Sequence, residues 1–145
     1  MEKEGVQRFL DAQNAVYDGY KQALEEVRDG RKVWHWIWYV FPQMRALGHS
    51  DWAVYYGIAD RKEAEDYLQN STLNERIHEI SEALLQHKGK SAVSIFGSLD
   101  AMKVQSCMTL FDAISPNDVF GRVLDQFYGG VRDERTLELL EVSNK

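Results

Sequence analysis

The sequence predicts an all-α domain, and three observations support this prediction. Apolar residues recur at spacings of three and four along most of the chain, as they do on the buried face of a helix. No segment alternates apolar and polar residues over several positions, as a half-buried strand would. The 145 residues contain no internal repeat and no linker rich in proline, serine or glycine. We therefore expect one compact domain over residues 1–145 with six or seven helices, two or three of them very short.

The first third of the chain predicts one long helix and two short ones. An apolar stripe runs through residues 6–28, and Gly30 ends the helix. The aromatic run 33–41 fits a helix or a strand by its period. The lack of a companion strand favours a short helix that ends before Pro42. Ser50 is a candidate cap for a further short helical segment.

The middle of the chain contains two capping patterns, each a hydroxyl or acid followed three residues later by a glutamate. Asp60 and Glu63 predict the start of one helix, and Thr72 and Glu75 predict the start of the next. The second helix has a regular amphipathic stripe and ends near Gly89. This second helix therefore has the character of scaffold.

The last third predicts one short and three longer helices. Ser91 can cap a single turn, and residues 99–114 form the next helix. Ser115, followed by proline and then by an acid in the first turn, predicts the start of another helix. The glycine pair at 129–130 ends this helix, and Asp133 can cap the last one.

The net charge and the cysteine count restrict the function classes. The formal charge is −6, which argues against general nucleic-acid binding because that binding depends on neutralising phosphates. Cys107 is the single cysteine and is expected to be a small buried apolar residue in a reduced compartment. The acidic N-terminus lacks the apolar stretch of a secretory signal, and the longest apolar run is far too short to span a membrane. We therefore expect a cytoplasmic protein with no membrane partner.

Aromatic residues and positive charges concentrate in one stretch. All four tryptophans lie between positions 34 and 52, and residues 34–56 hold eight of the 17 aromatic residues. Residues 28–49 carry a charge of +3, while the rest of the chain carries −9. A local basic and aromatic patch can hold one small anion even in an acidic protein, so this stretch is the first candidate for a site.

His35 lies inside the aromatic run and has two interpretations. It can satisfy a backbone carbonyl in the core, as buried polar groups usually do. It can also line a cavity and transfer a proton. Arg31 and Lys32 precede it directly, and in a helix Arg31 would project to the same side as His35.

The tryptophans are core residues by default, but their spacing argues that one is not. On a helix Trp36 points about 200° away from Trp34, so a single face cannot bury Trp34, Trp36 and Trp38 together. At least one should line a groove or lie at the surface. An exposed indole beside arginine suits a planar ring with a negative charge, such as a nucleotide.

A second polar group lies at the start of the predicted helix 99–114. Asp100, Lys103 and Ser106 are three residues apart and share one helical face. The simple interpretation is a solvent-exposed stripe with a weak ion pair. In the alternative, Ser98 and the free N–H groups of the helix start receive an anion, with Lys103 one turn further on.

The common catalytic and cofactor motifs are absent from the sequence. It contains no HExxH or similar zinc spacing, no GxGxxG or GxxxxGK[ST] phosphate loop and no GxSxG nucleophile elbow. His78 and His87 lie on a charged helix and are expected to be exposed. We therefore predict no metal site and no cofactor.

Several strings in combination point to one family. They are RFL at 8–10, AQ at 12–13 with Tyr17, GRK at 30–32, HWxWxxFPQ at 35–43, LG at 47–48, FG at 96–97 with Lys103, MTLF at 108–111 and YGG at 128–130. Together they resemble a bacterial domain-of-unknown-function family, number eighteen-ten, whose members are sometimes labelled "calpastatin". The resemblance covers about residues 7–140 and implies a compact, mainly helical single domain without an established activity. The composition does not support a calpastatin-like inhibitor, which would be disordered and rich in repeats.

The leading functional hypothesis is a cleft between residues 30–43 and the helix start at 97–109 that binds a small anionic, nucleotide-like ligand. Arg31 and Lys103 would hold the anion, and His35 would transfer a proton in any hydrolysis or group transfer. Trp36 or Trp38 would stack on the ring, and Gln43 would bind its polar atoms. The full set of candidate ligand contacts is Arg31, Lys32, Trp36, Trp38, Gln43, Ser98, Lys103, Ser106 and Thr109.

The alternative hypothesis is a protein-interaction module that uses an exposed aromatic surface, because tryptophan, tyrosine and arginine dominate interface hot spots. A concave pocket favours the first hypothesis, and a flat apolar patch favours the second. Binding of single-stranded RNA is a third hypothesis, which the net charge disfavours.

Overall fold

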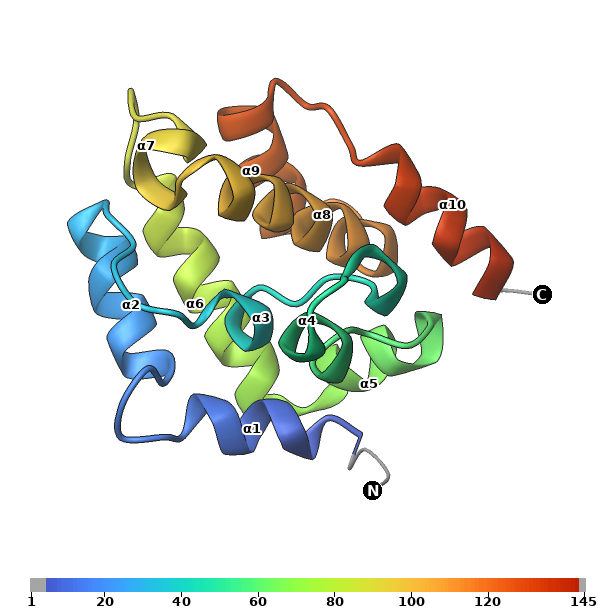
Figure 1. The fold of residues 1–145 in the computed structure, drawn as a ribbon. Coiled ribbons are helices and arrows are strands. Elements are labelled where there is room, and N and C mark those ends of the chain that lie inside the picture. The colour runs from blue at the N-terminus through green and yellow to red at the C-terminus, as the bar shows by residue number, and fades with distance from the viewer. Residues whose placement is uncertain (1–4, 144–145) are drawn as a thin grey trace.

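The computed structural model describes residues 5–143, which form helices joined by short loops (Figure 1). Within this range no β-strand forms, and the isolated bridge between Met44 and Ile58 is the only β-pairing. The predicted all-α class is confirmed. The elements are α1 (Gln7–Gln13), α2 (Tyr20–Asp29), α3 (Ile37–Val40), the 3-10 helix η1 (Arg45–Leu47), α4 (Asp51–Tyr55), α5 (Arg61–Gln69), α6 (Ser71–Leu85), α7 (Ala92–Phe96), α8 (Ser98–Ile114), α9 (Val119–Tyr128) and α10 (Glu134–Ser143).

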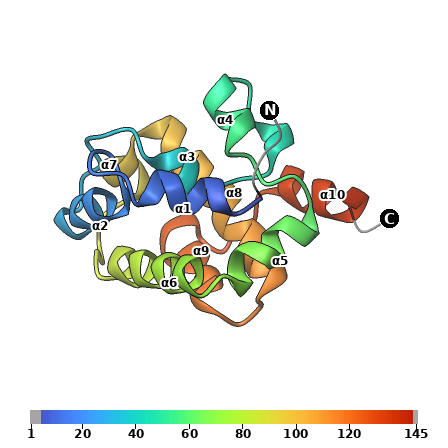
Figure 2. The same ribbon diagram turned by 90° about the horizontal axis from the view of Figure 1, so that it is seen from below.

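Helix α8 lies at the centre of the domain. It packs against α5, α7, α9 and α10, while α6 packs against α2, α5 and α9 on the other side of the core. The second half of α8 has apolar residues on almost every face, which is why other helices surround it. Helix α1 crosses one end of the domain and α10 lies along its edge, as Figures 1 and 2 show. Cys107 is fully buried in α8, as predicted, and burial raises the pKa of its thiol.

The helix expected over residues 6–28 is divided in two, and this prediction was wrong. The chain leaves the helix after α1 and turns through Asp18, which has a φ of 57°. At Gly19 a Cβ would lie 2.3 Å from the carbonyl oxygen of Ala15, so only glycine fits this turn. The break lets α1 pack against α3 while α2 packs against α6. It also leaves Tyr17, which the periodicity placed on the buried stripe, 85% exposed.

The aromatic run is helical over only its last part. Residues 33–36 are not helical, and α3 begins at Ile37 and ends before Pro42. This division explains how the run distributes its tryptophans: Trp36 is fully buried, whereas Trp34 is half exposed. The described residues contain ten α-helices where six or seven were expected, because the break in the first helix adds one and each short segment marked in the sequence forms a helix of its own.

Four of the expected helix caps are confirmed, and two lie at other residues. The side chains of Ser50, Asp60, Ser91 and Asp133 accept a backbone N–H from the first turn of α4, α5, α7 and α10. Helix α6 is capped by Asn70 instead of Thr72, because the chain already turns directly after α5. Helix α9 is capped by Asp118 instead of Ser115, which ends α8.

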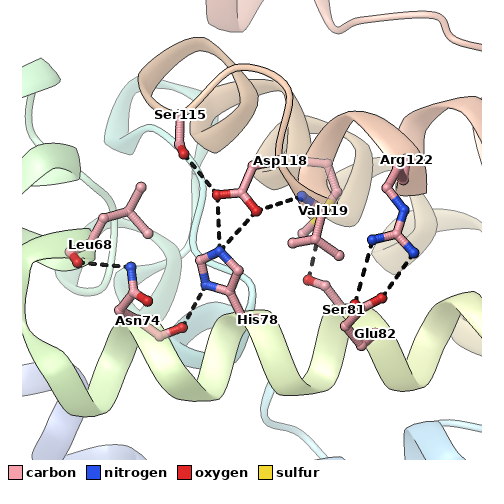
Figure 3. A network of polar contacts seen from close by, with 10 residues as sticks. Leu68, Asn74, His78, Ser81, Glu82, Ser115, Asp118, Val119 and Arg122 are labelled. Carbon is pink, nitrogen blue, oxygen red and sulfur yellow. Dashed lines mark hydrogen bonds and ion pairs between the residues drawn. The ribbon is translucent and has the colours of Figure 1, made fainter.

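Asp118 also joins the start of α9 to α6 through His78, as Figure 3 shows. Ser115 donates its hydroxyl to this carboxylate at 2.8 Å, and His78 Nε2 lies 3.0 Å from both of its oxygens. The other ring nitrogen of His78 lies 2.8 Å from the carbonyl oxygen of Asn74. His78 is therefore only partly exposed, at 31% of its side chain, because Asp118 and Phe120 contact its ring.

Candidate functional site

A pocket of about 330 Å³ lies between the segment after α3 and the start of α8. We call it the α8 pocket. Three of the predicted ligand contacts line it together, Gln43 from the first segment and Lys103 and Ser106 from α8. The two regions that the sequence singled out therefore meet here. The complete lining is Gln43, Leu47, His49, Leu99, Met102, Lys103, Ser106 and Asp133.

The charged groups around the α8 pocket are paired with one another. The carboxylate of Asp100 lies between two lysines, with Lys32 at 2.9 Å and Lys103 at 3.3 Å. The Lys103 ammonium also lies 5.4 Å from the ring centroid of Trp38. Trp38 therefore stands behind Lys103 and does not itself line the pocket. Together with Asp133, these charged side chains sum to zero, so the pocket is polar without being strongly basic.

The hydroxyls of α8 organise the floor of the pocket. Ser106 donates to Met102 and to the Asp133 carboxylate, each at 3.2 Å. Thr109 is fully buried and accepts the backbone N–H of Asp133 at 2.9 Å. Asp133 in turn caps α10 through the N–H of Thr136. Thr109 therefore positions Asp133 and does not face a ligand.

An aromatic pair lies beside Lys103 and joins it to α4. The rings of Trp38 and Trp52 lie 5.3 Å apart, and Trp52 remains 54% exposed. Arg8 on α1, a residue that the sequence analysis missed, anchors the end of helix α4. The Arg8 guanidinium, 2% exposed as a residue, donates to the carbonyls of Tyr55 and Gly57 at 2.8 Å.

Arg8 also forms a bidentate ion pair with Glu63, at 2.8 and 3.0 Å. Burial by itself would raise the pKa of Glu63, but the hydrogen bond from Arg8 and that from the Ala59 N–H lower it. No local sequence pattern predicts this anchoring role of Arg8, because its partners lie about 50 residues away. A charged residue on the apolar stripe of the first helix was the only available signal.

Trp36 is fully buried in the core and cannot stack on a ligand. Its indole N–H donates to Glu26 at 2.9 Å, and Lys32 lies over its ring at 5.2 Å. Lys32 therefore joins the ion pair of Asp100 to the core and does not line the pocket. Three tryptophans that alternate in sequence thus take three environments, because residues 33–36 are not helical.

Arg31 and His35 are exposed and do not line the α8 pocket. The helical spacing that would have brought their side chains to one side does not form. Ser98 is exposed at the first position of α8, whose preceding Gly97 provides no side-chain cap. The structure therefore brings Gln43, Lys103 and Ser106 to one pocket and adds His49, which the sequence analysis did not propose as a ligand contact.

Glu26 is the second buried charged residue that sequence reasoning missed. It is 5% exposed, and one of its oxygens accepts the backbone N–H groups of Val33 at 2.6 Å and Trp34 at 3.0 Å. The other oxygen accepts the side-chain amide of Gln22 at 2.7 Å. Burial by itself would raise the pKa of Glu26, but hydrogen bonds from Gln22, the two backbone N–H groups and Trp36 together lower it.

The cluster of Ser115, Asp118 and His78 has the residue types of a catalytic triad but not its order. In a triad the histidine stands between serine and acid, so that it can take the hydroxyl proton. Here Asp118 stands between the other two, and Ser115 donates directly to it (Figure 3). We therefore interpret this cluster as a structural link between α6 and α9.

Neither a metal site nor a membrane span is found among residues 5–143. No group of three or more histidine, cysteine, aspartate or glutamate side chains lies close enough to hold an ion. No helix in that range combines the length and the apolar character needed to cross a bilayer.

The sequence matches a family described as "Protein of unknown function (DUF1810)" over residues 3–140. The structure is similar to the crystal structure of the conserved hypothetical protein Rv1873 from Mycobacterium tuberculosis, with a TM-score of 0.89 and 44% sequence identity. The match covers 94% of this chain and 96% of that chain. A comparison with curated proteins found no match.

Proposed function

The chain belongs to the DUF1810 family, and we propose that it binds a small planar molecule with one anionic group, a nucleotide-like ligand, in the α8 pocket. The observation that carries the proposal is that Gln43, Lys103 and Ser106, from separate segments, line one cavity. A volume of about 330 Å³ lies at the lower end of the range for small-molecule sites. The bound portion is therefore about the size of one ring with its acidic group.

The side chains of the pocket suit the two parts of such a ligand. Leu47, Leu99 and Met102 provide apolar surface for a ring. Lys103 can turn from Asp100 toward an anion, since its ion pair is long and partly exposed. Because Asp133 balances this charge, a single acidic group fits better than a polyphosphate.

The proposal is limited to binding, because no activated nucleophile faces the pocket. The Ser106 hydroxyl already donates to Met102 and Asp133. The Cys107 thiol is buried, and His35 lies outside the pocket.

A thermal-shift and calorimetry panel tests this proposal. Nucleoside monophosphates are compared with the same nucleosides without phosphate and with inorganic phosphate alone. A monophosphate at ten times its Kd should raise the free energy of unfolding by about 1.4 kcal/mol. Lys103→Ala should weaken that binding at least tenfold, whereas Lys88→Ala, on an exposed loop, should not.

The absence of binding at millimolar monophosphate would overturn the proposal. Binding that survives Lys103→Ala unchanged would also overturn it, because the ligand would then lie elsewhere.

The exposed apolar rim of the pocket favours the second candidate function, protein interaction. Leu99 is 75% exposed and Met102 is 64% exposed, and both border the cavity. Apolar side chains this exposed beside a pocket are typical of partner surfaces. If Leu99→Ser and Met102→Ser abolish association with a protein partner while monophosphates show no binding, this second function replaces the first.

A further inference from the structure

A second, smaller pocket of about 240 Å³ lies on a different part of the surface. Its lining consists of Tyr17, Asp18, Gln22 and Trp34, and we call it the Trp34 pocket. The first two residues belong to the turn between α1 and α2, and Trp34 belongs to the segment before α3. The pocket therefore exists only because the first helix is broken and residues 33–36 are not helical.

Hydrogen bonds to Glu26 and from Tyr39 hold the residues that line the Trp34 pocket in place. The two oxygens of Glu26 hold Gln22, at 2.7 Å, and the backbone N–H of Trp34, at 3.0 Å. Tyr39 donates its hydroxyl to the carbonyl of Asp18 at 2.6 Å. Burial, with the charge of Asp18 as the next contribution, raises the pKa of Tyr39 to about 12, so this hydroxyl keeps its proton.

The chemistry of the lining is that of a cation site. Trp34 is 50% exposed and Tyr17 is 85% exposed, so both rings can offer a face to a ligand. The Asp18 side chain forms no hydrogen bond or ion pair with the described residues, and no lysine or arginine lines the pocket. Aromatic faces with one free carboxylate attract a cation and repel an anion.

A buried negative charge increases this preference. Glu26 lies directly behind Gln22 and Trp34, and within the described part of the chain its carboxylate has N–H partners but no lysine or arginine. Its charge is therefore reduced by dipoles but not cancelled by an ion. A ligand in the pocket experiences the fields of both Asp18 and Glu26.

We propose that the Trp34 pocket binds a small alkylated ammonium ion, with its methyl groups against the rings of Trp34 and Tyr17 and its charge beside Asp18. The volume is below that of most drug-sized sites, so a head group fits and a large ligand does not. An alkylated ammonium is favoured over a bare one, because it loses less hydration when it enters an aromatic site. This site is independent of the α8 pocket.

Calorimetry and NMR titration of the full chain with choline test the inference. The reference probe is 3,3-dimethylbutan-1-ol, which has the shape of choline without its charge. We expect saturable binding of choline in the millimolar range and at least fivefold weaker binding of the alcohol, in line with a cation–π contribution of about 1 kcal/mol. Equal binding of the two probes would overturn the proposal, as would the absence of saturable choline binding.

Two variants locate the binding. Trp34→Leu should weaken choline binding at least tenfold, and Asp18→Asn should weaken it about threefold to tenfold. Trp52→Leu is the matched control, because it removes an indole of similar exposure from another surface. Circular dichroism verifies that each variant is folded. Unchanged affinity in Trp34→Leu, or an equal loss in Trp52→Leu, would place the ion elsewhere and overturn the proposal.

A further arm identifies the source of the ammonium group. A peptide with trimethyl-lysine presents the same head group on a protein chain. Binding of choline with no binding of the peptide assigns the site to a free metabolite, and tighter binding of the peptide assigns it to a modified protein. Both results support the same chemistry.

Discussion

Trp34 and Trp52 are exposed to nearly the same extent, 50% and 54%, yet the regions that carry them are held by buried side chains of opposite charge. The segment with Trp34 is held by the buried carboxylate of Glu26. Helix α4, which carries Trp52, is held by the buried guanidinium of Arg8. In each region a single charged side chain from a neighbouring helix binds several backbone groups, and so keeps a large exposed ring in a defined place.

The difference lies in how each buried charge is compensated. Arg8 has an ionic partner in Glu63, whereas Glu26 is stabilised by N–H groups alone. The charges beside the two exposed rings also differ. Trp52 contacts Trp38, which in turn contacts Lys103, whereas Trp34 lies near Asp18. An exposed tryptophan therefore does not by itself indicate the charge of a ligand. Its neighbours, which come from distant segments, determine that charge.

Among the substitutions of the two buried charged residues, removal of the Arg8 side chain should lower the free energy of unfolding most. In Arg8→Ala the Glu63 carboxylate and the carbonyls of Tyr55 and Gly57 lose their partner. We expect the free energy of unfolding to fall by about 3–5 kcal/mol, measured by urea denaturation. Arg122→Ala is the control, because its ion pair with Glu82 is exposed and should contribute no more than about 0.5 kcal/mol. A loss below about 1 kcal/mol for Arg8→Ala would show that α4 does not depend on this residue.

Glu26→Gln should have a smaller effect, because the new side chain keeps one acceptor. Its amide nitrogen would then face either the Gln22 amide or the N–H groups of residues 33 and 34, and these are all donors. We expect a loss of about 2 kcal/mol in the free energy of unfolding. Glu25→Gln, on the exposed face of the same helix, is the control and should be neutral. An unchanged free energy of unfolding in Glu26→Gln would show that the negative charge of Glu26 does not stabilise this region.

The pH dependence of stability should test whether the charge of Glu26 stabilises the fold. The pKa of Glu26 is lower in the folded state than its ordinary value of 4.5. Its contribution is therefore present above about pH 4.5 and is lost as the pH falls through the folded-state pKa. The stability difference between the wild type and Glu26→Gln should narrow when urea denaturation is repeated from pH 7 down to pH 3. A constant difference across this range would contradict the prediction.

The smallest effects are expected at the exposed rings themselves. Trp34→Leu and Trp52→Leu should each change the free energy of unfolding by less than about 1 kcal/mol, because half of each side chain already faces solvent. Trp36→Ala should cost about 3–5 kcal/mol, because that ring is fully buried and bonded to Glu26. Equal losses at positions 34 and 36 would mean that Trp34 is a core residue and not part of a ligand site.

Part of the candidate site could be predicted from local sequence signals. The start of α8, with Lys103 and Ser106 on one face, follows from helical spacing, and its meeting with Gln43 is consistent with the proposed cleft. Arg31 and His35 could not be placed in this way. Their expected alignment depended on a helix over residues 33–36, and the hydrogen bonds that Val33 and Trp34 donate to Glu26 hold that segment in another conformation.

The sequence by itself determined the helical class, most of the helix starts and the burial of Cys107, because capping and apolar periodicity act within a few residues. The tertiary structure alone decided where the first helix breaks, which tryptophan is buried and which charge lies beside each exposed one. The burial of Trp36 and the positions of the two exposed rings depend on Arg8 and Glu26, whose hydrogen bonds join separate segments of the chain. A buried charge must find enough partners to offset its desolvation, and only the folded chain determines where those partners lie.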